Sequence, residues 1–155
     1  MSKSLKVKLT FVDLTPDSDG AKNAPVADPT PDVSEFLTDA EYIEGERCEL
    51  IYKESPELGM GSCKITISWL ADQPGIISIM RSGEVETVMT FEQGKRYISS
   101  YTMPGMAFEL CTRTIKCKNN FDGTPGGELY LDYVVEVRGG FAGRRKMTAR
   151  VISEN

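Results

Sequence analysis

Hydrophobic and polar residues alternate through most of this chain, and residues 75–105 show the pattern most clearly. Alternation at a period of two is typical of β-strands that bury one face. Ser82-Gly83 and Gln93-Gly94 interrupt the pattern, and glycine accepts the positive φ angles of tight hairpin turns. Pro104-Gly105 ends it, because proline has no backbone donor to continue a ladder. The segment therefore predicts an antiparallel meander of three strands, at about 77–81, 85–91 and 96–103.

The same alternation recurs on both sides of this meander. No segment shows a helical period over the eleven or so residues that a convincing helix needs. Strands spaced by about 8–12 residues predict an all-β fold. Consecutive hairpins favour a calycin-like or lipocalin-like antiparallel up-and-down β-barrel of about 8–10 strands, since closure removes exposed edges. The further strands are expected at about 5–11, 33–43, 47–54, 63–69, 106–118, 129–138 and 146–151.

Two details of this scheme are less regular. In the strand at 33–43, one phase buries Phe36 and Tyr42 and the other buries Val33 and Leu37, so a bulge that switches the buried face is expected. A turn is expected at Asp72-Gln73-Pro74-Gly75, just before the central meander.

The length of 155 residues predicts a single β-barrel domain over residues 1–155. Four prolines and several aspartates between Thr15 and Pro31 favour a mobile loop insertion at 15–31. The N-terminal residues lack the apolar stretch of a secretory signal, and no apolar run approaches the ~18 residues of a membrane span. A cytoplasmic location with no membrane partner is therefore expected.

Charge and residue usage argue against several functions. The net charge of −5 disfavours nucleic-acid binding, although basic residues gather near the C-terminus. This basic strip is interpreted as a solvated strand face, with phosphate contact as the alternative. Asp132 and Glu136 are interpreted as solubilising charges on an outward face. The basic strip near the C-terminus comprises Arg138, Arg144, Arg145, Lys146 and Arg150.

The chain contains no histidine, which removes the usual general base and the commonest metal ligand. No pair of cysteines has the C-x-x-C spacing of structural zinc sites, so free thiols are expected. We therefore expect no metal, no cofactor and no enzymatic activity, with catalysis by carboxylates, lysine or tyrosine left open as an alternative. The cysteines are Cys48, Cys63, Cys111 and Cys117.

Arg81 and a set of hydroxyl side chains are the candidate ligand-binding residues. Arg81 follows Ile77 and Ile79 on one face and lies next to a turn. It could orient an anionic head group at a barrel mouth, or cap the barrel end by pairing with a carboxylate such as Glu109. Hydroxyls on inward faces indicate either a lumen of mixed polarity or a filled barrel whose hydroxyls bond internally. The predicted ligand-binding set is Arg81, Tyr97, Tyr101, Thr112, Thr114 and Tyr133.

Several short motifs, in order and at matching spacing, resemble the YwiB-like family of small bacterial proteins. They are Met80-Arg81-Ser82-Gly83, Met103 with Phe108-Glu109-Leu110, and Thr112-x-Thr114, with weaker support from Phe36-x-Thr38, Tyr42 and Leu58-Gly59. The resemblance covers most of residues 5–152 and implies a calycin-like β-barrel of unknown function, without an established activity. Two functions stay open: a barrel that binds a small apolar or amphipathic ligand in its lumen, or a filled structural or protein-interaction module. A homodimer is compatible with either.

Overall fold

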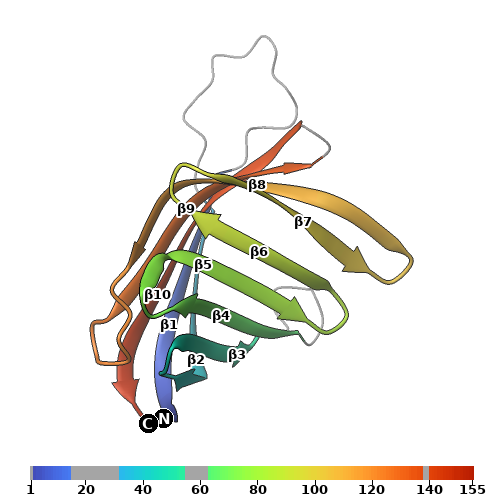
Figure 1. The fold of residues 1–155 in the computed structure, drawn as a ribbon. Coiled ribbons are helices and arrows are strands. Elements are labelled where there is room, and N and C mark those ends of the chain that lie inside the picture. The colour runs from blue at the N-terminus through green and yellow to red at the C-terminus, as the bar shows by residue number, and fades with distance from the viewer. Residues whose placement is uncertain (1, 15–31, 55–62, 138–139) are drawn as a thin grey trace.

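A computed structural model describes residues 2–14, 32–54, 63–137 and 140–155. Ten antiparallel strands form a closed barrel in which each strand lies beside its neighbours in the sequence, and the last strand closes onto the first (Figure 1). The two termini consequently lie side by side (Figure 1). The strands are β1 (Ser2–Leu14), β2 (Asp32–Ile43), β3 (Arg47–Lys53), β4 (Lys64–Leu70), β5 (Gln73–Ser82), β6 (Glu86–Glu92), β7 (Arg96–Met103), β8 (Met106–Asn119), β9 (Glu128–Val137) and β10 (Gly140–Glu154).

The alternation in the sequence accounts for this architecture. On β1, Leu5, Val7 and Leu9 are buried, whereas Lys6 and Lys8, which alternate with them, lie on the outer face. The other strands likewise contribute inward side chains to a single core cluster. The predicted closed up-and-down barrel is confirmed, with ten strands.

Two local predictions are wrong. β2 keeps one phase, with Phe36 and Tyr42 on the inward side, and its ladder with β1 has no register shift, so there is no bulge. The turn before the meander is tighter than expected, because Leu70 already pairs with Gln73. The proposed loop at 15–31 and the Leu58-Gly59 motif lie outside the described residues.

Aromatic side chains close one end of the barrel. Phe121, in the segment between β8 and β9, is buried against Tyr42 and Trp69, with ring centroids 5.2 and 5.8 Å away. Gly123 lies directly on Tyr42, at a φ of 78° that only glycine adopts readily. Any ligand space must therefore lie toward the opposite end of the strands.

The hydrogen-bonded wall is thin at two places. β2 pairs with β3 only through Glu41–Ile43, although its ladder with β1 runs along its whole length. β6 pairs with β7 only through Glu86 and Thr87. The described part of the chain contains no helix with the length and hydropathy to cross a membrane.

Candidate functional site

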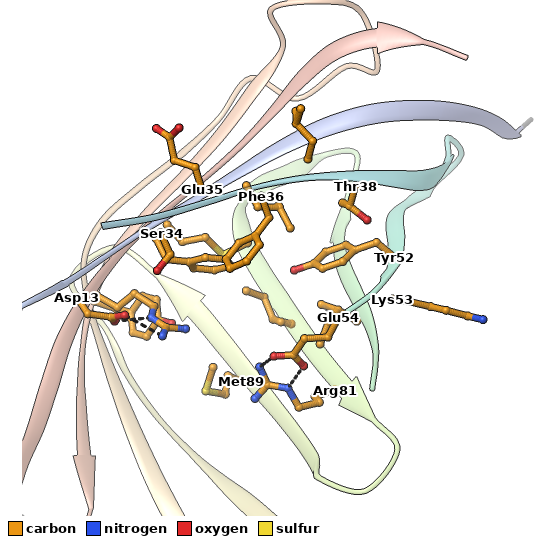
Figure 2. A pocket seen from close by; sticks show the side chains of 18 residues that line it. Asp13, Ser34, Glu35, Phe36, Thr38, Tyr52, Lys53, Glu54, Arg81 and Met89 are labelled. Carbon is orange, nitrogen blue, oxygen red and sulfur yellow. Dashed lines mark hydrogen bonds and ion pairs between the residues drawn. The ribbon is translucent and has the colours of Figure 1, made fainter. Parts of the chain in front are cut away.

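A cavity of about 540 Å³ opens where β2 and β3 diverge, at the end opposite Phe121. Figure 2 shows Ser34, Phe36 and Thr38 of β2 directed toward it, while Glu35 points away. The cavity is bordered by inward residues of β2 such as Phe36 and also by the outward residues Glu35 and Leu37. The mouth of the cavity therefore lies at the edge of β2. The lining residues are Leu9, Phe11, Asp13, Ser34, Glu35, Phe36, Leu37, Thr38, Tyr52, Lys53, Glu54, Ile65, Ile79, Arg81, Met89, Tyr133, Arg145 and Met147.

Arg81 forms a bidentate ion pair across the barrel end. Its Nε and Nη2 donate to the two carboxylate oxygens of Glu54 at 2.9 and 3.1 Å (Figure 2). The Glu54 side chain is only 4% exposed and that of Arg81 is 18% exposed. The predicted capping role thus has support, but the partner is Glu54 and not Glu109.

A second bidentate pair joins Arg145 to Asp13. Arg145 Nε and Nη2 donate to the carboxylate of Asp13 at 2.7 and 3.1 Å, and the guanidinium lies 5.0 Å from the centre of the Phe11 ring. Asp13 and Tyr133 are the direct cross-strand neighbours of Arg145, which places the three side chains in one row. This pair is less buried than the first, since the side chains are 37% and 32% exposed.

Two tyrosines contribute polar groups deep in the cavity. Burial raises the pKa of Tyr52 well above its usual value, and the nearby Glu54 carboxylate acts in the same direction. Burial also raises the pKa of Tyr133, although Arg145 partly opposes the shift. Both phenols are therefore neutral near pH 7 and can donate or accept a hydrogen bond.

The remaining lining is mostly apolar and the formal charges balance. The rings of Phe11 and Phe36 lie 6.3 Å apart, and Ile79 and Met89 are paired neighbours on β5 and β6. The lining contains three basic residues and three acidic residues, so their formal charges cancel. They are Lys53, Arg81 and Arg145, and Asp13, Glu35 and Glu54. The cavity thus presents fixed donors and acceptors beside an apolar wall, without a net charge.

The structure brings together only two of the six predicted ligand-binding residues, Arg81 and Tyr133. The other four lie outside the cavity lining. Tyr97 donates to Glu92 at 3.0 Å, and Tyr101 stacks on Phe108 at 5.0 Å. Thr112 donates to the carbonyl of Thr90 at 3.1 Å, and Thr114 is buried without a side-chain hydrogen bond among the described residues.

The sequence reasoning missed the cavity residues Asp13, Glu54 and Arg145. Each one continues the inward phase of its strand just beyond the apolar run, as Arg145 does for Met147. This continued alternation is a sequence signal that could have identified the three residues as inward-facing. The interpretation of Arg145 as part of a solvated strip is wrong, because its guanidinium lines the cavity.

The acidic residues Asp132 and Glu136 on β9 are both engaged in ion pairs. Asp132 is not a free solubilising charge, because it is 5% exposed and accepts two hydrogen bonds from Arg144 at 2.9 and 2.7 Å. Glu136 pairs with Arg96 at 3.0 Å. Each of the four cysteines is a reduced thiol that is not part of a disulfide, in line with the sequence-based expectation. Among the described residues, no cluster of acidic or cysteine side chains has the composition of a metal site.

Comparison with known proteins places the chain in a family. A family model described as a domain of unknown function (DUF1934) matches residues 23–148. The chain belongs to this family. The crystal structure of the ywiB protein from Bacillus subtilis matches with a TM-score of 0.67 and 20% sequence identity, over 97% of this chain and 92% of that one. This confirms the YwiB-like resemblance and, at that identity, shows the shared barrel fold. No curated protein matches the chain significantly.

Proposed function

We propose that this DUF1934 protein is a non-enzymatic binding barrel whose cavity holds a small amphipathic molecule. The observation that supports the proposal is the cavity itself, whose volume of about 540 Å³ falls in the range of small-molecule sites. A barrel filled entirely by side chains would leave no such space.

The arrangement of the lining indicates how the ligand would lie. Its apolar part would pack against Phe11, Phe36 and Met89. Its polar part would meet Arg145, whose pair with Asp13 is about one-third exposed and lies close to the mouth. Arg81 is more enclosed by Glu54 and serves mainly to hold the opposite wall. This ordering makes Arg145 the principal polar anchor and assigns Arg81 a supporting role.

A fluorescent amphipathic anion, anilinonaphthalene sulfonate, tests the proposal. We expect saturable binding with increased fluorescence, and Arg145→Leu should weaken it about tenfold because a charge-assisted contact is lost. Ser34→Trp should abolish it by filling the mouth, since Ser34 is half-buried on the cavity side of β2.

Arg150→Leu is the matched control, because Arg150 lies on β10 but is exposed on the outer face. Circular dichroism checks that each variant is folded. Probe binding that responds to neither Arg145→Leu nor Ser34→Trp would show that the cavity is not a ligand site.

A further inference from the structure

Among the described strands, none lies beside the edge of β2 that runs along the cavity mouth. The β3 ladder covers only Glu41–Ile43, so the described residues provide no ladder partner for Val33–Ala40 on that side. In an antiparallel sheet, every second residue directs its N–H and C=O toward a given neighbour. A row of backbone donors and acceptors therefore borders the opening.

Within the described residues, this edge lacks most of the features that protect natural sheet edges. Such edges carry charged residues, above all lysine, or proline, bulges or inward-pointing charges, or they are covered by a helix or loop. Val33–Ala40 contains no lysine or proline, its register with β1 is regular, and its inward side chains are uncharged. Its two outer acids, Glu35 and Asp39, are already paired with Lys8 and Lys6 at 3.5 and 2.7 Å. An edge of this kind is suited to accept another strand.

The divergence between β6 and β7 differs in this respect. There the carbonyl of Thr90 accepts a hydrogen bond from Thr112, and the turn at Gly94 and Lys95 exchanges backbone hydrogen bonds with Thr114. β8 therefore covers part of the gap from inside. Of these two thin places in the wall, the β2 edge contributes the run Ser34–Thr38 to the cavity lining, whereas β6 contributes Met89 alone and β7 contributes no residue.

We infer that Val33–Ala40 accepts an extended peptide of a partner protein by strand addition, with alternating apolar and basic side chains. The apolar side chains would enter the cavity beside Phe36. The basic side chains would lie beside Glu35 and Asp39 on the outer face. On the β1 side of β2, Lys8 and Lys6 already form ion pairs with these two acids. Leu37 is 66% exposed between these acids and would be covered by the added strand.

The shape of the opening favours a single strand over a second barrel. Two hollows share Thr38, Tyr52 and Lys53, so the groove continues along the divergence between β2 and β3. The opposite bank, Tyr52–Glu54, faces the β2 edge across the cavity (Figure 2). A lone peptide carries no second strand, so it fits between the β2 edge and Tyr52–Glu54. The β2 strand of a second copy is already paired with its own β1, and that β1 would have to fit into the same groove. The inference does not depend on a lumenal small molecule.

A labelled peptide copy of residues 5–13, LKVKLTFVD, is a suitable probe because this sequence pairs with β2 in the required alternation. We expect saturable binding in fluorescence anisotropy with the full chain. Two further peptides carry N-methyl groups on alternate amides, at the positions of Val7, Leu9 and Phe11 or at those of Lys6, Lys8 and Thr10. Only one set of amides can face β2, so one peptide should lose at least about tenfold in affinity and the other should not.

Leu37→Lys, which adds a positive charge to the edge, should weaken binding about tenfold. Ile98→Lys is the matched control, because Ile98 is 72% exposed on β7 and away from the groove. Absence of saturable binding, equal effects of the two methylation patterns, or equal effects of the two lysine variants would overturn the inference. A dimer that Leu37→Lys converts to monomer, with no peptide binding, would assign the edge to a second copy. None of these outcomes alters the expected response of the fluorescent probe to Arg145→Leu.

Discussion

The two arginines at the cavity have the same geometry but different surroundings. Each binds one carboxylate through Nε and Nη2. The pair of Arg81 with Glu54 is almost enclosed, whereas the pair of Arg145 with Asp13 is about one-third exposed. A buried charge that loses its partner keeps its full desolvation penalty, while an exposed charge is solvated by water. The first pair is therefore expected to matter for stability and the second for binding.

Glu54→Gln should lower the free energy of unfolding by about 3 kcal/mol, because Arg81 would remain buried without its counter-charge. Urea denaturation followed by circular dichroism measures this loss. Glu54→Leu combined with Arg81→Met should recover most of it, since apolar residues of similar volume replace buried ion pairs well. Glu35→Gln, which breaks the exposed pair with Lys8, should change stability little, and a loss equal to that of Glu54→Gln would contradict the argument.

At the level of elements, the segment between β8 and β9 closes the barrel end that the strands leave open. Phe121 fills the space beside Tyr42 and Trp69, and Gly123 allows the backbone to pass close to the Tyr42 ring. An ideal Cβ on Gly123 would lie 2.7 Å from that ring. Turn-forming residues predicted a loop here, but the sequence contains no local signal that a loop phenylalanine enters the core.

Gly123→Ala should therefore destabilise the protein more than Gly126→Ala. Both glycines have positive φ, 78° and 91°, so alanine carries a similar backbone penalty of about 1 kcal/mol at each. Only Gly123 has neighbours within 4 Å of the new methyl group, and the clash with Tyr42 should add about 1–3 kcal/mol. Equal shifts of the urea midpoint in the two variants would show that the segment is not packed on Tyr42.

At the level of the whole molecule, the sequence predicted the order of the strands better than the lengths of their ladders. Alternation identifies which residues face inward, and consecutive hairpins then place each strand beside the next. Where β2 leaves β3 depends on how ten strands close into a ring, which no single strand encodes. Partners such as Arg81 and Glu54, which lie on either side of β4, follow from that closure. The cavity arises from the same divergence, and this explains why most of its lining was not predicted.

The cavity also determines how the stability of the whole barrel should depend on alkaline pH. Burial raises the pKa of Tyr52 and Tyr133 in the folded protein, whereas in the unfolded chain a tyrosine ionises near its usual value of about 10. Below that value both states are protonated, so the stability contribution is fully present. Above it the unfolded chain releases protons that the folded barrel retains, and the free energy of unfolding must fall as pH rises toward the folded pKa.

We therefore expect the urea midpoint to decrease above about pH 10, and the decrease to be smaller in the Tyr52→Phe/Tyr133→Phe variant. Tyr101→Phe is the comparison, because Tyr101 lies on β7 outside the cavity and is only half-buried. Absorbance at the phenolate band provides a second readout, in which Tyr52 and Tyr133 should ionise only as the barrel unfolds. An identical pH profile in the double variant and in the wild-type chain would mean that these phenols are hydrated in the native state, and the cavity would then be wetter and more open than its lining indicates.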